Sequence, residues 1–317
     1  IVLGCGDNYV EMLSKLKDKL PENVIAPYID HELMVQLIFK ENFYKLCDKH
    51  GIDYPATLVY SRGMGSDVDV KFQYPVILKP TNGVDYFHHP FEGQHKIYKL
   101  NSLEEVKKTI EDIYASGYSD KLIPGNDEYM RVLTCYSDRN HKVKMMCLGH
   151  VLLEEHTPLG LGNHALIITE PNDSLTEKVR NLLEDLDFVG FSNFDIKYDS
   201  RDGKYKFFEL NCRQGRSNFY VTNSGFNIAR YLVEDYIEQK DIPFKTAQDE
   251  YLWMVVPKAV AFKYVKDPEM KQRMKKLIKE KKMVNPLFMR GDLGLKRYLR
   301  LVKGHLRHYS NYKKYYN

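Results

Sequence analysis

Apolar and polar residues recur along this chain with two different periods, which divide it into predicted helices and strands. Apolar spacings of three and four predict amphipathic helices at 10–20, 30–50, 102–117, 173–188, 225–239 and 271–282. Alternating or β-branched segments bounded by turns predict strands at 1–6, 57–61, 74–80, 129–138, 143–155, 191–199 and 204–211. The strand at 1–6 and the helix after it are typical of the end of an α/β unit. We therefore expect an N-terminal portion to precede Ile1.

The strands at 191–199 and 204–211 are joined by the turn sequence SRDG and predict a β-hairpin. Side chains alternate across a strand, so each strand is expected to have one polar face. The members of these faces are Asn193, Asp195 and Lys197 on the first strand, and Phe207, Glu209, Asn211 and Arg213 on the second. A turn near 199–203 places Asp195 opposite either Phe207 or Glu209.

The polar face of this hairpin combines two carboxylates, an amide and a guanidinium. Mg²⁺ prefers oxygen ligands, commonly one or two carboxylates completed by water and substrate phosphates. Asp195, Glu209 and Asn211 are therefore candidate Mg²⁺ ligands, and Arg213 is a candidate for stabilising charge on a transferred phosphoryl group. The alternative is a surface hairpin with solvated charges. Four phenylalanines on these strands favour burial and hence a partner for the carboxylates.

The composition is that of an ordinary globular enzyme, with 43% hydrophobic and 28% charged residues. No apolar stretch approaches the roughly 18 residues that a membrane-spanning helix needs. The five cysteines are scattered and form no CxxC pair, which is typical of reduced thiols in a cytoplasmic protein. Cys212 alternates with the polar hairpin residues and is expected to face the core. His88 and His89 lack a third ligand at metal spacing, so a zinc site is not predicted.

The charge is uneven along the chain. Residues 266–317 contain sixteen Lys and Arg against four Asp and Glu, although the whole chain has a net charge of only +4. This basic tail could pack as a solvated face on the acidic body, contact anionic lipid at the inner membrane face, or attract an anionic substrate or nucleic acid. We favour the first and then the second, and we expect no nucleic acid because no known binding module accompanies the charge.

The pattern E-x-N-x-R after an apolar strand, with an aspartate one strand earlier, resembles the metal-binding signature of ATP-grasp enzymes. The resemblance extends over residues 30–240 and implies two phosphate-binding lysines, matched here by Lys40 and Lys79. Within that family, several segments are similar to the D-aspartate ligases of bacterial cell-wall synthesis. These segments are IVLGCGDNY, FYKLCDKHGIDYP, IPGNDEYMRVLTCYSD, FDIKYDSRDGKYKFFELNCRQGRSNFY and GDLGLKRYLR.

This resemblance implies an α/β (α+β) ATP-grasp fold in which two subdomains clasp ATP. The implied parts are a truncated Rossmann-like piece at 1–30, a helix and small lid subdomain at 31–123, a central catalytic subdomain at 124–245, and a basic, mainly helical region at 246–317. Two departures stand out. The lid loop TNGVDYFHHPFEG has few glycines, and DKLIPGN is about five residues shorter than the family pattern near Leu122 and Ile123.

The implied reaction is an ATP- and Mg²⁺-dependent amide synthesis through an acyl phosphate. A D-aspartate ligase would activate the β-carboxylate of D-aspartate and join it to the lysine side-chain amine of a peptidoglycan precursor, possibly UDP-linked. The alternatives are an ATP-grasp ligase for other amino acids or peptides, and a catalytically silent ATP-binding scaffold.

Several further residues are candidates for substrate contacts. Arg216 and Ser217 could bind a substrate carboxylate or form an ordinary salt bridge and cap. Glu128 could contact the ribose or simply begin a solvated strand. The loop at 154–165 is expected to cover the acceptor. Within it, His156 and His164 could assist deprotonation of the amine, although loop histidines more often serve as hydrogen-bonding groups.

Overall fold

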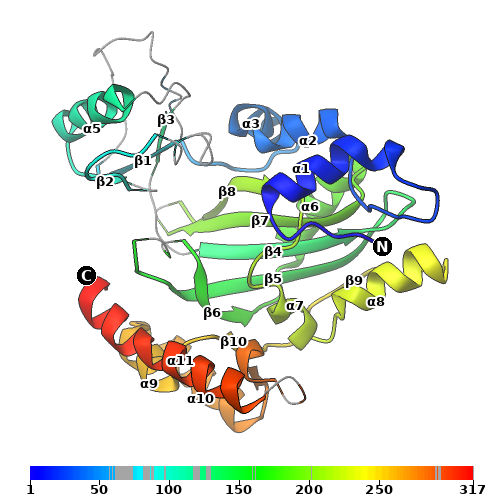
Figure 1. Cartoon of the computed structure of the whole chain (residues 1–317). Helices are drawn as coiled ribbons and strands as arrows, with labels where there is room; N and C mark the ends of the chain where they lie inside the picture. Colours follow the sequence, from blue (N-terminus) through cyan, green and yellow to red (C-terminus); the bar gives the residue numbers. More distant parts are fainter. Residues whose placement is uncertain are drawn as a thin grey trace.

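The structure is a computed structural model built around one large mixed β-sheet (Figure 1). It describes residues 1–56, 58, 60, 74–80, 86, 89–95, 98–116, 122–125, 130–158, 160, 162–200, 202–289, 291 and 294–316, with the backbone alone at 77, 79, 80 and 122–125. The large sheet has the order β11 (Met283–Val284), β10 (Leu252–Met254), β6 (His164–Thr169), β5 (Val143–Glu154), β4 (Met130–Ser137), β7 (Gly190–Asp199) and β8 (Lys204–Asn211), and β9 (Lys245–Thr246) pairs with β5. Its central strands are antiparallel, whereas β10–β11 and β5–β9 are parallel pairs.

A second, three-stranded antiparallel sheet stands apart from the large one (Figure 1). Its order is β2 (Tyr98–Leu100), β1 (Val76–Pro80) and β3 (Leu122–Gly125), and α5 (Leu103–Ala115) packs on it. The hydroxyl of Ser102 accepts a hydrogen bond from the backbone N–H of Glu105 at 3.2 Å, which caps the helix as its sequence predicts. The strand predicted at 57–61 lies largely outside the described residues.

The two faces of the large sheet carry different helices because side chains alternate along its strands. One face packs against α1 (Asp7–Leu16), α2 (His31–Ile38), α3 (Lys40–Lys49) and α6 (Asp173–Asp185). The other face packs against α7 (Phe219–Asn223) and α8 (Ile228–Leu232). A third apolar cluster joins β6 and β10 to α9 (Lys258–Tyr264), α10 (Pro268–Lys279) and α11 (Leu295–Tyr315). The basic tail therefore packs on the body through a hydrophobic contact centred on Tyr312.

Three predicted elements differ from the structure. Residues 1–6 form no strand, since the backbone bond from Val2 N–H to the Ile25 carbonyl (2.8 Å) does not extend into a ladder. The predicted helix at 30–50 is two helices separated at Phe39, whose backbone is extended (ψ 113°). The segment at 225–239 is not one regular helix, because α8 ends in a π-helical turn at Val233–Ile237.

The break at Phe39 determines the position of a candidate site residue. Lys40 becomes the first residue of α3, and both α2 and α3 contact β8. Neither proline nor glycine marks this break in the sequence. Apolar periodicity alone would place Lys40 inside a helix, but the resemblance to ATP-grasp enzymes implies that this lysine starts one. The structure confirms the second expectation, since Lys40 is the first residue of α3.

Candidate active site

The hairpin of β7 and β8 forms the platform on which the predicted metal ligands lie. Asp195 pairs directly with Glu209, which confirms one of the two predicted registers. The ladder then shifts by one residue, so that Ile196 pairs with Phe207 and leaves Phe208 as the extra residue of a β-bulge.

This bulge corrects one part of the predicted face. Phe207 does not share a face with Glu209, because the extra residue reverses the alternation between them. Phe207 is buried instead with Phe194 in the core cluster below the platform. Phe208 takes its place on the polar side, where the ammonium of Lys197 lies 5.9 Å from its ring centre. Cys212 is buried in the core as predicted, and burial raises the pKa of its thiol to about 12.

Lys40 reaches this platform from the start of α3. Its ammonium lies 2.9 Å from Oε2 of Glu209, and its side chain is only 10% exposed. The pair is 169 residues apart in sequence, so the contact depends on α2 and α3 packing against β8. A lysine predicted to meet phosphate therefore lies directly beside a predicted metal ligand.

Arg213 follows the end of β8 and is held by a residue that the sequence analysis did not select. Its Nε and one terminal nitrogen donate to the two carboxylate oxygens of Asp7, at 2.5 and 3.0 Å. The same terminal nitrogen lies 3.3 Å from the side-chain oxygen of Asn211. Burial lowers the pKa of Arg213, but Asp7, together with the charges of Asp195 and Glu209, raises it overall. The guanidinium is therefore fixed and charged beside the two carboxylates.

A buried hydrogen-bond network supports the platform from behind. The Thr134 hydroxyl lies 2.9 Å from the side-chain oxygens of both Asn193 and Asn218, and it accepts a hydrogen bond from Tyr220 at 3.0 Å. Gly215 passes so close to Asn193 that a Cβ at this position would lie 2.7 Å from its side-chain oxygen. The sharp turn after Arg213 is thus locked against β7, which fixes the direction of the residues that follow.

Arg216 and Ser217, which come directly after this turn, meet two residues of the 154–165 region. The Arg216 guanidinium lies 3.5 Å from Oε1 of Glu155, and its side chain remains 69% exposed. The hydroxyl of Ser217 lies 3.2 Å from Nδ1 of His164. Burial, with a smaller contribution from Arg216, lowers the pKa of His164 to about 4. His164 is therefore neutral at physiological pH and acts here as a hydrogen-bonding group.

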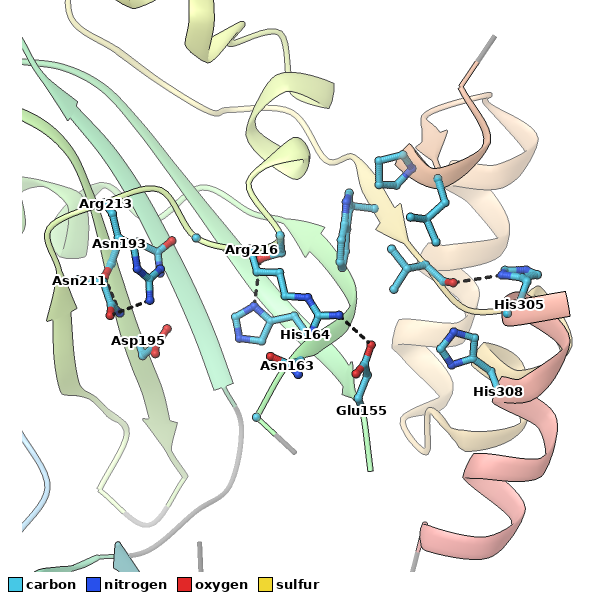
Figure 2. A pocket seen from close by; sticks show the side chains of 18 of the residues that line it. Glu155, Asn163, His164, Asn193, Asp195, Asn211, Arg213, Arg216, His305 and His308 are labelled. Carbon is cyan, nitrogen blue, oxygen red and sulfur yellow. Dashed lines mark hydrogen bonds and ion pairs between the residues drawn. The ribbon is translucent and has the colours of Figure 1, made fainter. Parts of the chain in front are cut away.

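These residues surround one pocket of about 500 Å³ (Figure 2). Figure 2 shows Asp195, Asn211 and Arg213 on one side and His305 and His308 of α11 on the other. Arg216, His164, Asn163 and Glu155 lie between the two sides. The complete lining also includes Gly162, Asn193, Glu209, Gly215, Ser217, Trp253, Val255, Pro286, Leu287, Arg300, Leu301 and Gly304.

The pocket extends further than the sequence analysis predicted. The basic tail was expected to be a solvated face, but α11 contributes one face to the pocket wall. Asp7, Glu155 and Trp253 were also not identified, since nothing local in the sequence marks them as site residues. The 154–165 region does line the pocket through Glu155, Asn163 and His164. His156 packs against Tyr316 instead, with 4.5 Å between ring centres.

Two predicted nucleotide contacts fall outside this description. Glu128 lies outside the described residues. The backbone of Lys79 belongs to β1, where it pairs with Ile123 of β3, but its side chain is also outside the described part. The roles of Lys79 and Glu128 stay predictions.

The donor set on the platform fits Mg²⁺. Directly paired cross-strand residues have Cβ atoms about 5 Å apart, close enough for two carboxylates to share one cation. Asn211 adds a neutral oxygen on the same face. Within the described ranges, no group of three or more His, Cys, Asp and Glu side chains could hold a metal. Two carboxylates and one amide supply part of the coordination that Mg²⁺ needs, and substrate phosphate and water commonly complete it.

Comparison with known proteins identifies the family. No family model matches the sequence. Over 332 aligned residues the chain is 40% identical to a D-aspartate ligase of Enterococcus faecium (strain Aus0004), an alignment that covers 100% of this chain and 79% of that protein. The chain belongs to the D-aspartate ligase family. It is thus an ATP-dependent carboxylate–amine ligase of the ATP-grasp class, as its resemblance implied.

Solved structures show the same fold as this ligase. It matches an L-amino acid ligase from Bacillus licheniformis with a TM-score of 0.53 and 14% identity, over 72% of this chain and 54% of that one. It matches the biotin carboxylase domain of 2-oxoglutarate carboxylase from Hydrogenobacter thermophilus with a TM-score of 0.58 and 13% identity, over 75% and 52%. The chain thus spans about half the length of these two structures. At this low sequence identity, the match shows a shared fold.

Proposed function

We propose that this ligase joins the β-carboxylate of D-aspartate to the lysine side-chain amine of a peptidoglycan precursor, possibly UDP-linked. The observation that supports D-aspartate as the donor is the 40% identity to a D-aspartate ligase over the full chain. The acceptor follows from the resemblance to the ligases of bacterial cell-wall synthesis. The proposal also divides the chain into four parts, at 1–30, 31–123, 124–245 and 246–317. The protein would act in the cytoplasm, where the precursor is made.

In the proposed reaction, Asp195, Glu209 and Asn211 would hold Mg²⁺, which would supply positive charge near the phosphates of ATP. The solved 2-oxoglutarate carboxylase domain, which shares the fold, was crystallised with MgADP. Lys40 and Lys79 would neutralise the nucleotide phosphates, and Glu128 would meet the ribose. Lys40 is well placed for this role because its ammonium already lies at the platform.

A β-carboxylate oxygen of the donor attacks the terminal phosphorus of ATP, and the bond from that phosphorus to the ADP oxygen breaks. The products of this step are β-aspartyl phosphate and ADP. Arg213 stabilises the negative charge that grows on the transferred phosphoryl group, and Asp7 holds its planar fork in one orientation. Arg216 binds the second carboxylate of the donor, since its long and exposed contact with Glu155 is easily exchanged. Positioning and charge stabilisation supply most of the catalysis in such a reaction.

ADP release with a panel of donors and acceptors tests the proposal. The full chain is incubated with ATP, Mg²⁺, D- or L-aspartate, other D- and L-amino acids, and a lysine-containing muropeptide. We expect release that requires both D-aspartate and the muropeptide. Equal release with other amino acids would instead support a ligase acting outside cell-wall synthesis, and nucleotide binding without turnover of any pair would support a silent scaffold.

We also propose that the outer face of α11 contacts the inner membrane surface. None of the helices in the described part of the chain is long and apolar enough to cross a bilayer. Leu295, Leu299 and Leu306 are exposed along α11, and the helix contains seven Lys and Arg and no Asp or Glu. Such helices bind anionic lipid surfaces. Sedimentation with phosphatidylglycerol vesicles should exceed that with phosphatidylcholine vesicles, and Leu299→Glu with Leu306→Glu should abolish the difference.

A further inference from the structure

The second step of the proposed reaction poses a chemical problem that the platform residues do not solve. An alkyl amine such as a lysine side chain has an ordinary pKa of about 10.4, so it arrives as an ammonium ion that cannot attack. The ligase must bind this cation and remove one proton near the acyl phosphate. The inference below rests on the proposed function and concerns where this happens.

The acidic residues that line the pocket indicate which side chain could bind the acceptor ammonium. Three acids line it among the residues that the structure describes, namely Asp195, Glu209 and Glu155. Asp195 and Glu209 form the metal platform, and Glu209 is also paired with Lys40. Glu155 lies away from them, between the platform and the histidines of α11 (Figure 2). It is therefore the acid placed to meet a second substrate that approaches the platform from the α11 side.

Backbone contacts fix the position of Glu155 at the start of its loop. Its N–H donates to the carbonyl of Asn163 at 2.8 Å, which closes the base of the loop and brings both side chains to the pocket. Gly160 turns back over the acid, and a Cβ at this position would lie only 2.6 Å from Oε2 of Glu155. The glycine thus leaves the space that the carboxylate occupies.

The groups around Glu155 would compete only weakly with a substrate ammonium for its carboxylate. Arg216, from the segment after β8, is 3.5 Å away and largely exposed, so solvent screens this pair. His164 of β6 is neutral. On α11, burial lowers the pKa of His308 and raises that of Tyr312, which the charges of Glu155 and Glu154 raise further. Among the residues that the structure describes, Arg216 is the cation that forms an ion pair with Glu155, and Arg300 of α11 also lines the pocket. A substrate ammonium that replaces Arg216 at Glu155 would release this arginine toward the donor.

We propose that Glu155 forms the subsite for a primary ammonium group of the acceptor and is the base that deprotonates it. One proton passes from the ammonium to the Glu155 carboxylate. The amine nitrogen then attacks the acyl carbon and forms the C–N bond, and the bond from that carbon to the phosphate oxygen breaks. Phosphate leaves with the electron pair and takes the second nitrogen proton, which yields the amide and hydrogen phosphate.

A comparison of two nucleophiles tests this role. Hydroxylamine is uncharged near neutral pH, so it traps the acyl phosphate without needing a base, whereas a lysyl peptide needs one. In Glu155→Gln, we expect lysyl-peptide coupling to fall about 100-fold or more, in the range usual for loss of a general base. Hydroxamate formation from D-aspartate, ATP and hydroxylamine should stay within about twofold of the wild type. Glu154→Gln, at the neighbouring position and outside the pocket lining, should change neither rate.

The pH dependence gives a readout that a structural role would not move. Between pH 7 and 9, coupling by Glu155→Gln should rise about tenfold per pH unit, because only the free amine reacts, while the wild type should be much flatter. Equal loss of both reactions, or retention of both, would overturn the role of Glu155. Absence of hydroxamate in the wild type with every donor would instead contradict the proposed function itself.

Discussion

The two sides of the pocket are built in different ways. The platform side is a pair of adjacent strands whose ladder fixes Asp195 opposite Glu209. Lys40 forms an ion pair with Glu209, and Asp7 forms one with Arg213. The α11 side is assembled from a loop, a short strand and a helix that come from distant parts of the chain. The platform suits chemistry that is common to ATP-grasp ligases, and the α11 side suits recognition of a particular acceptor. The predictions for Glu209, Arg213 and Arg300 each change a residue on one side of the pocket and compare lysyl coupling with hydroxamate formation.

The largest effect is expected on the platform. Glu209→Gln removes a carboxylate from the proposed Mg²⁺ site, so both coupling and hydroxamate formation should fall by about three orders of magnitude or more, since metal-ion charge stabilisation supplies several kcal/mol. The thermal midpoint should change little. Glu41→Gln on α3, where the carboxylate forms an exposed pair with Lys45, is the matched control. Rates near those of the wild type would remove Glu209 from the metal site.

Acid should destabilise the ion-pair cluster around Glu170, which lies directly after β6 and pairs with residues of β4 and β5. Glu170 contacts Arg131, His150 and Arg273, the last from α10. Burial raises its pKa, but His150 and Arg131 outweigh burial and lower it from 4.5 to about 2. The ionised Glu170 therefore contributes about 3 kcal/mol to the free energy of unfolding above pH 4.5, and this contribution is lost as the pH falls toward 2. Denaturant unfolding should show this slope between pH 5 and 2, and Glu170→Gln should flatten it.

A smaller effect is expected from the orientation of Arg213. Arg213→Lys keeps the charge and loses the planar fork held by Asp7, so kcat should fall about tenfold or more with both nucleophiles. Asp7→Asn should act in the same direction, and the two changes together should cost less than their sum because they disrupt one contact. Arg180→Lys on α6 is the control. Additive effects would show that Asp7 does not position Arg213.

The smallest effect is expected on the α11 wall. Arg300→Ala removes a cation that lines the pocket, and the KM for the muropeptide should rise about fivefold, equivalent to about 1 kcal/mol. Hydroxamate formation should not change. Arg297→Ala, on the same helix and outside the pocket lining, is the control. An equal change in the KM for D-aspartate would show that the two sides of the pocket are not separate.

The same contrast explains how far the sequence predicts the site. Strand alternation is local, so it correctly grouped Asp195, Glu209 and Asn211 without any knowledge of the tertiary structure. The bulge at Phe208 was not predictable, because one extra residue in a strand does not show in its pattern of apolar and polar residues. It reversed the predicted position of Phe207 while leaving the polar residues beyond it together.

Contacts between distant segments account for what was missed. Asp7 and Arg213 are 206 residues apart, and no local pattern links a helix start to the end of a distant strand. The pocket face of α11 depends on Tyr312 packing beneath β6 and β10, where its hydroxyl donates to the Glu154 carbonyl at 2.5 Å. Charge counting marked the tail as basic but gave no information on which face is buried. Residues such as Glu155 and Trp253 become site residues only once these segments are assembled.

Transfer of oxygen from donor to phosphate tests the central claim most directly. D-aspartate labelled in its β-carboxylate with the heavy oxygen isotope is coupled to the lysyl muropeptide, and the released phosphate and the amide are weighed by mass spectrometry. An acyl-phosphate ligase predicts one heavy oxygen atom in the phosphate and one in the new amide, with no transfer from an α-carboxylate label. Unlabelled phosphate from β-labelled D-aspartate, released during active coupling, would contradict the account.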